Sequence, residues 1–511
     1  VAPIIVHLAK TRETHTVSGV GPWPRRASVE FFRERCGGEI PLGVLRTVVP
    51  AAPDAWCTAL ARWGTLSFAD VAAPALECAA QGFPLSVFSA ALIRDNEAAF
   101  RRWPTTTALY LPGGRPRAAG ERFVQPELAR TIETMIAAER RARGQGREQA
   151  IRAARDAFYR GEIAEAICAF HRREGGLLAP EDLAEFSVEV APALRTTFRE
   201  FEVAVCGFWC QGPVLLQMLN LLEPYDLGAL GHNSPRYLHL LAEAIKLAFA
   251  DRERYNGDPR FVNVPVDALL SQAYADKRRA MIRPDRASPD MPPPGEAPGF
   301  AHRHGPAPTT TRAAAGARDT SYVCVADRHG NVFSATPSDS SYDMPVVPGL
   351  GICPSSRGSQ NWADPSHPSS VEPGKRPRLT PAPAMAILDD GSVMPIGTPG
   401  GDVQAQAMLQ VLLNITVFGM NPQQAVEQPR FASYSFPDSF EPHSYQPGVL
   451  HVEGRVPKAV REGLAKRGHK IEDWPDFVWR AGAVCVLKAD RKRGVLSGGA
   501  DPRRPAYACG W

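Results

Sequence analysis

Residues 317–331 read ARDTSYVCVADRHGN, and this stretch decides the fold because a threonine stands between a polar segment and a strand pattern. The segment TSYVCVAD (320–327) reads as a strand, RHGN (328–331) as a tight turn, and VFSAT (332–336) as the returning strand of a hairpin. Thr320 therefore marks a strand entrance. It is either an ordinary polar residue there or a nucleophile that is released when the chain is cut.

The segment before this hairpin has an unusual composition. Residues 287–318 are dominated by proline, alanine, glycine and threonine, and they offer almost no side chains that could fill a core. The composition predicts a flexible linker over 287–319, between one region at 1–286 and another at 320–511.

A threonine that follows a linker and begins a strand has the arrangement that an N-terminal nucleophile enzyme needs. The Thr320 hydroxyl would attack the Asp319 carbonyl, the amide would become an ester, and water would cut the chain. The freed α-amine of Thr320 could then serve as the base for its own hydroxyl. The alternative is that the side chain only binds neighbouring backbone.

A second pattern of this kind is TPGGD at 398–402, where two glycines precede an apolar helical pattern. Gly400 and Gly401 could present successive backbone N–H groups at a helix N-terminus, which favours negative charge. An oxyanion hole requires such donors. A plain turn from a strand to a helix is the alternative.

The remaining elements fall into a helix-rich first half and a mixed second half. Apolar periodicity predicts helical stretches over 59–82, 126–143, 149–173, 235–254 and 403–415. Proline and glycine are expected to break the first of these at Gly64, Pro74 and Gly82. Alternating patterns predict strands between 186 and 205, around the turn at 390–391, and near the C-terminal end, whereas residues 354–384 are rich in loop-forming residues.

Composition excludes several classes of protein. Apolar residues make up 44% and charged residues 22% of the 511, and the formal net charge is +4, so neither disorder nor a nucleic-acid partner is indicated. No apolar run reaches the ~18 residues of a membrane span.

The ten cysteines show no spacing typical of a metal site, and no motif in the sequence indicates a metal or an organic cofactor. A reducing, cytoplasmic location is expected, with a periplasmic one open because a segment could precede residue 1.

Several longer motifs together resemble the γ-glutamyltransferase family of N-terminal nucleophile hydrolases. The motifs are FYRGEIAEAICAFHRREGGLLAPEDLAEFSVEV (158–190), HLLAEAIKLAFADRERYNGDP (239–259), DTSYVCVADRHGNVFSAT (319–336), TPGGD (398–402), AVEQPRF (425–431) and GGADPRRPAYACGW (498–511). The resemblance implies an α+β fold, a four-layer αββα sandwich made from a precursor that cuts itself between Asp319 and Thr320. The large and small fragments would stay together as an intramolecular heterodimer.

The resemblance also implies roles for individual residues. Thr320 matches the nucleophile of the family, and Ser338 falls where the family has a second threonine whose hydroxyl supports that nucleophile. Gly400 and Gly401 match the oxyanion glycines. The catalytic machinery is therefore expected to be complete.

The residues that the family uses to hold the glutamyl group are mostly replaced. An arginine that binds the α-carboxylate gives way to about Val20 in TVSGVGPWP, with Arg25 and Arg26 nearby as possible replacements. An aspartate that binds the α-amine belongs to a loop that here reads SSRGSQNWAD, where a gapless count gives Trp362, with Asp364 two residues on. Trp362 would form an apolar or stacking wall for a substrate, or else would only pack the loop.

Two further positions bear on substrate binding. The paired serines that follow the KRP motif of the family are Leu379 and Thr380 here, so one hydroxyl remains. Thr380 and Ser340 are the expected polar contacts of the acyl group. Loss of each charged partner costs about 2–5 kcal/mol, so glutamyl selectivity should be lost.

Three hypotheses follow. The first is an autoprocessing amidohydrolase or acylase that cleaves a small-molecule amide through a Thr320 acyl-enzyme, with water or an amine as acceptor, and whose acyl group is not a standard γ-glutamyl group. The second is a genuine γ-glutamyl transferase or hydrolase with replacement contacts. The third is an unprocessed scaffold without catalysis.

Overall fold

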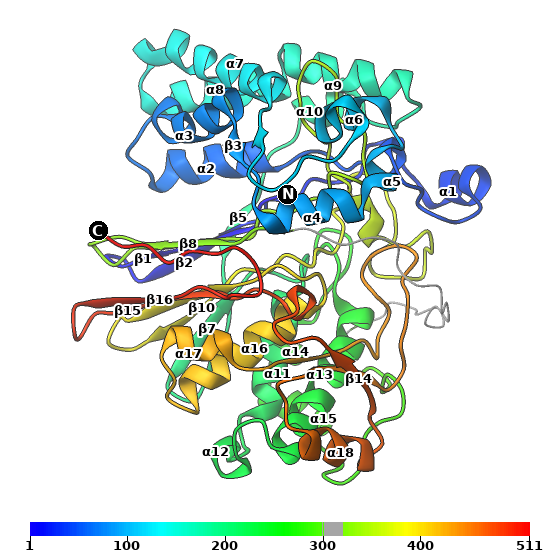
Figure 1. Cartoon of the computed structure of the whole chain (residues 1–511), viewed down its shortest axis with the longest axis vertical. Coiled ribbons are helices and arrows are strands. Elements are labelled where there is room, and N and C mark those ends of the chain that lie inside the picture. The colour runs from blue at the N-terminus through cyan, green and yellow to red at the C-terminus, as the bar shows by residue number, and fades with distance from the viewer. Residues whose placement is uncertain (299, 301–319) are drawn as a thin grey trace.

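Two antiparallel β-sheets lie face to face at the centre of the molecule, and helices cover the outer face of each sheet (Figure 1). A computed structural model describes residues 1–298, 300 and 320–511 of this protein. The layers run helix, sheet, sheet, helix. The α+β class and the αββα sandwich that the sequence predicts are thereby confirmed.

The first sheet has the strand order β5-β2-β1-β9-β8. Its strands are β1 (Ile4–Leu8), β2 (Glu13–Val17), β5 (Val190–Pro192), β8 (Val323–Ala326) and β9 (Val332–Ala335). Ile4 of β1 pairs with Val17 on one side and with Ala335 on the other. The predicted hairpin after Thr320 is thus inserted beside the first strand of the chain.

The second sheet has the strand order β16-β15-β11-β10-β7-β6. Its strands are β6 (Leu194–Phe198), β7 (Phe201–Val205), β10 (Ala384–Leu388), β11 (Val393–Gly397), β15 (Cys485–Asp490) and β16 (Val495–Gly499). Ala384 pairs with Val205 and with Ile396, so this sheet also joins strands from both sides of the linker. Regions 1–286 and 320–511 therefore build one fold together.

Side-chain alternation in the central strands creates the layers. Ile5 points between the sheets, where it packs with Met385 and Val393, whereas Ile4 and Val6 point outward against the first helical layer. Full burial of one such side chain stabilises the fold by roughly 1.5–3 kcal/mol. A period of two in the sequence thus fixes which face of each strand meets which layer.

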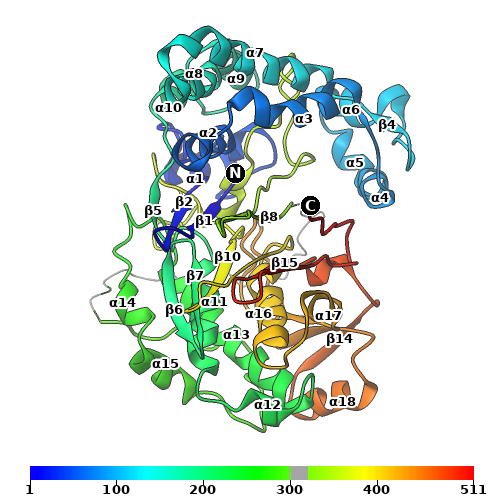
Figure 2. The same cartoon turned by 90° about the vertical axis from the view of Figure 1, so that its left-hand side faces the viewer.

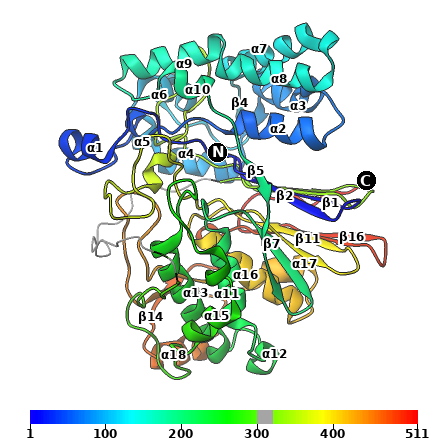
Figure 3. The ribbon, with the colours of Figure 1, turned by 180° about the vertical axis from the view of Figure 1, so that it is seen from behind.

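The helices form two groups on opposite sides of the sheets, as the side and rear views show (Figures 2 and 3). The helices on the side of the first sheet include α2 (Ala52–Trp63), α3 (Phe68–Gln81), α4 (Val87–Asp95), α6 (Pro104–Tyr110), α7 (Pro126–Ala142), α8 (Arg147–Tyr159), α9 (Glu162–Arg173) and α10 (Pro180–Ala184). On the other side lie α11 (Gly212–Leu222), α13 (Pro235–Tyr255), α15 (Gln272–Arg279), α16 (Val403–Thr416), α17 (Pro422–Glu427) and α18 (Lys458–Lys466). Further elements are α1 (Val29–Cys36), α5 (Glu97–Phe100), α12 (Leu227–Leu230), α14 (Val266–Leu269), a three-stranded sheet of β12 (Phe431–Ser433), β13 (Val449–Glu453) and β14 (Lys470–Trp474), and the pair β3 (Phe83–Pro84) and β4 (Arg122–Phe123).

Helix α13 is the longest of these and begins where the sequence predicts. The Ser234 hydroxyl accepts a hydrogen bond from the Tyr237 amide at 3.1 Å, and Pro235 occupies the first turn. Most of its side chains are buried. It therefore forms the central helix of the second helical layer.

No helix within the described parts of the chain is long and apolar enough to cross a membrane.

Two local predictions are wrong. Pro74 does not break its helix but lies inside α3, so the expected interruption at this position is absent. Residues 186–189 are not part of a strand, because β5 begins only at Val190. Phe186 instead packs in the helical core around Tyr159, which explains its apolar character.

The beginning of the predicted linker is part of the folded body. The Glu243 carboxylate accepts hydrogen bonds from the amide and hydroxyl of Ser288, and the Asp251 carboxylate accepts one from the Gly295 amide at 2.7 Å. Residues 287–297 thus lie along α13, held by its polar side chains. Residue 299 and residues 301–319, which include Asp319 and the predicted cleavage site, lie outside the described residues.

Candidate active site

Thr320 and Ser338 are brought together at the end of the hairpin. They form an isolated antiparallel bridge, and the Thr320 Oγ1 lies 2.7 Å from the Ser338 Oγ. Both residues are buried, with 9% and 7% of their surfaces exposed. The Ser321 amide donates to the Pro337 carbonyl at 2.9 Å, which fixes the backbone next to the pair. The geometry can support a hydroxyl nucleophile, and the roles assigned to both residues stay predictions.

Arg357 is a functional candidate that the sequence reasoning missed. It lies in a 3-10 helix, Arg357–Gln360, and its guanidinium donates a hydrogen bond to the Ser338 Oγ. Only 2% of the residue is exposed. Because a guanidinium can only donate, the Ser338 oxygen must accept from it. One feature of the sequence could have indicated it: Arg357 lies in the loop SSRGSQNWAD, in which the family has the aspartate that binds the substrate α-amine.

The glycine turn lies between β11 and α16. Gly400 and Gly401 have φ angles of 132° and 58°, which side chains with a Cβ rarely adopt. The Tyr322 ring packs against Gly397, where an added Cβ would come within 2.1 Å of the ring. The segment that carries Thr320 therefore touches the strand that leads into the turn. An oxyanion role for the two glycines stays a prediction.

A buried ion pair holds the residue that follows this turn. Arg252 Nη1 of α13 lies 2.5 Å from the Asp402 Oδ1, and both side chains are almost completely buried. The Ser439 amide donates to the other oxygen of Asp402 at 2.7 Å. Burial alone would lower the pKa of Arg252, but Asp402 and Glu253 raise it. The pair fixes the start of α16 and with it the glycine turn.

Thr380 lies beside the glycine turn. The side-chain amide of Gln211 donates both to the Thr380 carbonyl at 2.8 Å and to the Gly401 carbonyl at 2.9 Å. The Thr380 hydroxyl accepts from the Gln360 amide at 3.1 Å. Leu379, in contrast, is 1% exposed and packs into the core formed by the second sheet and its helices. Leu379 therefore makes an apolar core contact at a position where the family has a serine hydroxyl.

Trp362 is enclosed by other rings. Its indole stacks on His367 and on His443, each with ring centroids 3.8 Å apart, and the Arg378 guanidinium lies 4.8 Å from its centroid. Stacking of a substrate on this indole would require one histidine to move. The carboxylate of Asp364 accepts hydrogen bonds from the amide and hydroxyl of Ser366, both at 2.9 Å.

The stretch that replaces the family arginine also lies away from solvent. Val20 is fully buried in the core of the second sheet. Arg25 and Arg26 are exposed, and the Arg25 guanidinium pairs with Glu185. Neither arginine therefore occupies the buried place of Val20. Ser340, the remaining substrate candidate, is 3% exposed and lies two residues after Ser338.

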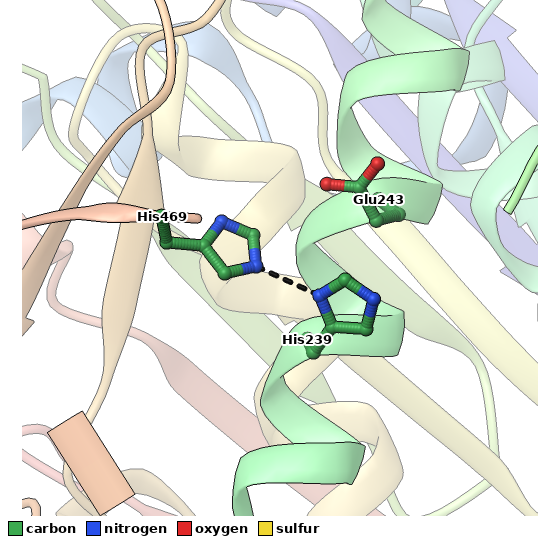
Figure 4. A group of neighbouring side chains, drawn as sticks. All are labelled: His239, Glu243 and His469. Carbon is green, nitrogen blue, oxygen red and sulfur yellow. Dashed lines mark hydrogen bonds between the residues drawn. The ribbon is translucent and has the colours of Figure 1, made fainter. Parts of the chain in front are cut away.

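A separate group of buried side chains offers the atoms that metal ions bind. It consists of His239 and Glu243 on α13 and of His469 just before β14 (Figure 4). His239 Nδ1 lies 2.8 Å from His469 Nε2, and His239 Nε2 lies 2.7 Å from the Arg283 carbonyl. Since a carbonyl can only accept, the His239 proton is on Nε2, and His469 donates to Nδ1.

The Glu243 carboxylate of this group is already neutralised. Its Oε1 accepts from the buried Lys246 ammonium at 2.7 Å, and its Oε2 accepts from the Ser288 hydroxyl at 2.7 Å. A divalent cation would have to compete with that ammonium in a buried environment. The contacts therefore explain the group as a hydrogen-bonded connection between α13, the segment around Ser288 and β14.

Comparisons with known proteins show which family this chain belongs to. Residues 3–511 match the gamma-glutamyltranspeptidase family. The chain is 34% identical to the acylase ACY 1 proenzyme of Pseudomonas sp. (strain SE83), over 90% of this chain and 74% of that protein. It is 30% identical to the glutathione hydrolase-like YwrD proenzyme of Bacillus subtilis (strain 168), over 98% and 87%.

A solved structure shows the same similarity at the level of the fold. The cephalosporin acylase from Bacillus halodurans superimposes with a TM-score of 0.84 at 28% identity, covering 100% of this chain and 87% of that chain. The sequence match spans both sheets, the hairpin at Thr320 and the glycine turn. The chain therefore belongs to the gamma-glutamyltranspeptidase family.

Proposed function

We propose that this chain is the proenzyme of an acylase, which cuts itself before Thr320 and then cleaves small-molecule amides through a Thr320 acyl-enzyme. The observation that carries the proposal is the 2.7 Å contact between the Thr320 and Ser338 hydroxyls directly after the linker region. The relatives named above as an acylase proenzyme and a cephalosporin acylase support it.

Self-cleavage needs only groups of the chain and one water molecule. The Thr320 Oγ1 attacks the carbonyl carbon of Asp319, and the C–N bond breaks as the amide becomes an ester with a free α-amine. Water then hydrolyses the ester. The products are a carboxylate at Asp319 and a threonine whose amine and hydroxyl are both free. Residues 1–319 and 320–511 remain joined through both sheets.

Turnover would use the new amine as the base. It takes the proton of the Thr320 hydroxyl while Ser338 holds that oxygen, and the oxygen attacks the acyl carbon of the substrate. The amide N–H groups at Gly400 and Gly401 would stabilise the negative oxygen that forms. The leaving amine takes the proton, and water or a second amine then removes the acyl group.

The acyl group would differ from a standard γ-glutamyl group. Val20 is buried in the core and Arg25 is paired at the surface, so neither offers the α-carboxylate contact, and Leu379 has no hydroxyl; two expected contacts of a glutamyl group are therefore not offered by these residues. The second candidate is a γ-glutamyl hydrolase with other contacts, which the similarity to a glutathione hydrolase-like protein over 98% of this chain favours.

A gel and a mass spectrum test the proposal. The purified protein should run as two fragments, residues 1–319 and 320–511, and a Thr320→Ala variant should remain one chain. Incubation with acyl anilides should add the acyl mass to the fragment that begins at Thr320. Ser321→Ala, which removes the neighbouring hydroxyl, should process and acylate normally. A single full-length band in the wild type would favour an unprocessed scaffold instead.

A further inference from the structure

Arg504, near the C-terminal end of the chain, lies next to the nucleophile candidate Thr320. Its Nη1 is 3.4 Å from the Thr320 carbonyl oxygen, and 9% of the residue is exposed. Since a guanidinium can only donate, the carbonyl accepts this hydrogen bond. A nearly buried positive charge therefore lies beside the backbone of the residue that the proposed self-cleavage turns into a chain terminus.

From this contact we propose that Arg504 is a positioning residue of the processed enzyme, which holds the Thr320 carbonyl and keeps the new α-amine of Thr320 unprotonated near neutral pH. This role rests on the proposed acylase function, in which that amine is the base. It requires no contact between Arg504 and the acyl group of the substrate.

Two aromatic rings restrict the guanidinium of Arg504. It lies 5.2 Å from the ring centroid of Phe88 on α4 and 5.1 Å from that of Trp479, in the 3-10 helix Trp479–Ala481. The two rings meet edge to face, with centroids 6.2 Å apart. Because the faces of aromatic rings attract a cation, these contacts limit where the side chain can point. A guanidinium also keeps its charge at any pH at which the enzyme would work.

Buried ion pairs fix the backbone from which Arg504 extends. Asp501 pairs with Arg430, and Arg503 donates to both carboxylate oxygens of Glu453, at 2.7 and 2.6 Å. These four side chains are at most 1% exposed. Arg504 is therefore held both through its backbone and through its side chain.

The charge of Arg504 would act on the α-amine at short range. The nitrogen and the carbonyl oxygen of one residue are at most about 3.6 Å apart, so the Thr320 nitrogen lies within about 7 Å of the Arg504 Nη1. A cation at that distance lowers the pKa of an amine, by about one pH unit at an effective dielectric constant of about 20. The amine can then accept the proton of the hydroxyl at a lower pH.

Two other charged groups approach Thr320 through Ser338. Arg357 contacts the Ser338 hydroxyl, and the carboxylate of Asp339, the next residue, lies 3.5 Å from the Arg357 Nε. The Asp339 carboxylate by itself would favour the protonated amine, but the Arg357 guanidinium lies against it. Arg504 thus adds a second positive charge on the side of the Thr320 carbonyl.

Two further titratable groups lie close to these residues. The amino group of Val1 lies 3.2 Å from the Asp339 carboxylate and offsets its charge further. Burial raises the pKa of Tyr322 well above its usual value, so this phenol stays neutral, and its hydroxyl forms a hydrogen bond with Ser334 at 2.7 Å. The charges named here therefore favour the neutral form of the Thr320 amine.

The dependence of kcat/KM on pH measures the effect in the processed enzyme. The substrate is para-nitrophenyl acetate, an activated ester whose small acyl group needs no particular pocket, and the rate of a Thr320→Ala variant is subtracted. The lower limb of the profile reports the protonation of the base in the free enzyme. Three variants separate the charge from the hydrogen bond: Arg504→Gln keeps an N–H donor, Arg504→Lys keeps the charge, and Arg504→Met keeps neither.

The lower limb should lie about one pH unit higher in the Gln and Met variants than in the wild type, and close to the wild type in the Lys variant. On the limb, Arg504→Gln should thus lower kcat/KM by about 10-fold, whereas at high pH it should lower it by less than about 3-fold. The matched control is Arg480→Met, which removes an exposed cation lying 5.6 Å from the same Trp479 ring and should not move the limb.

A lower limb at the same pH in all proteins, with rates reduced at every pH in the Arg504 variants, would reject this role and leave the acylase function intact. The wild type alone can also overturn it, even if a variant fails to process. Labelling of the processed wild type with acetic anhydride should reach half its maximum at Thr320 below the pH of about 7.7–8.0 of an ordinary α-amine. Half-labelling at or above that pH would reject the role of Arg504. A wild type that stays one chain would instead contradict the proposed function itself.

Discussion

Ser338 connects the nucleophile candidate to a cation, because its hydroxyl oxygen contacts both the Thr320 Oγ1, at 2.7 Å, and the Arg357 guanidinium. Since the guanidinium occupies one lone pair of the Ser338 oxygen, the serine is strengthened as a donor toward Thr320. An oxygen held in this way would carry negative charge more easily during attack. The contact between the two hydroxyls is thus part of a hydrogen-bonded series of three residues, Thr320, Ser338 and the cationic Arg357.

Removal of this hydroxyl should slow both self-cleavage and turnover. Ser338→Ala is expected to lower the rate of each by about 10- to 1000-fold, a loss typical of one well-placed donor. Ser338→Thr keeps the hydroxyl and should retain most of both rates. Gel densitometry over time and anilide turnover measure the two rates. Equal rates in the alanine variant and the wild type would contradict a supporting role.

Loss of the buried ion pair between Arg252 and Asp402, next to the glycine turn, should lower both the unfolding free energy and kcat. Arg252→Met leaves the Asp402 carboxylate buried without its cation, which typically costs about 3–5 kcal/mol of unfolding free energy. Because substrate binding does not use this pair directly, kcat should fall more than KM rises. Urea unfolding and steady-state kinetics test both statements. A rise of KM with an unchanged kcat would place the pair in substrate binding instead.

Stability should decline as the pH falls below about 6.5. Burial lowers the pKa of His239, and burial lowers the pKa of His469 to about 2, so both histidines are neutral in the folded protein. In the unfolded chain they take up protons near pH 6.5. Their contribution is therefore complete above that pH and is lost below it, by up to about 1.4 kcal/mol per pH unit for each histidine.

The measurement is the unfolding midpoint in urea between pH 7.5 and 5. His469→Gln should flatten the dependence on pH, because it removes one of the groups that is protonated only on unfolding. The matched control is His329→Gln, which changes an exposed histidine in the hairpin turn and should leave the slope unchanged. An identical slope in the His469 variant would show that other groups cause the acid sensitivity.

Restoring a serine at position 379 should not restore glutamyl binding. Leu379 is 1% exposed and packs into the main core, so Leu379→Ser replaces a buried apolar side chain by a smaller polar one. The expected cost is about 2–5 kcal/mol in unfolding free energy. Turnover of γ-glutamyl anilide should stay as low as in the wild type. A gain in that turnover would show that the hydroxyl alone was missing.

The parts of this molecule that could be predicted from sequence are those that local patterns determine. The hairpin after Thr320 follows from strand periodicity and the RHGN turn, and α13 follows from its Ser234 cap and apolar stripe. The contact between Arg357 and Ser338 crosses 19 positions of irregular loop, where no periodicity indicates which side chains meet. The enclosure of Trp362 was hidden for the same reason, because His443 lies far along the chain.

The ordered start of the linker could not be predicted from the sequence for a related reason. Its composition offers few apolar side chains, and composition alone predicts a loose segment. The segment is nevertheless held, because Tyr255 of α13 donates to the Gly295 carbonyl at 2.6 Å and accepts from the Ala297 amide at 2.9 Å. Backbone groups need no apolar side chains for such bonds. Only the three-dimensional position of α13 reveals their partners.

The position of β9 between β1 and β8 sets an order of events during synthesis of the protein. A ribosome that has made only the first 319 residues has not yet produced β9 or Ser338, so the first sheet cannot be completed at that stage. The bridge between Thr320 and Ser338 extends the pairing of β8 with β9, so it can form only after β9 and Ser338 have been made. A chain truncated before residue 332 lacks both β9 and Ser338, so the proposed self-cleavage should be slower in it than in the full chain.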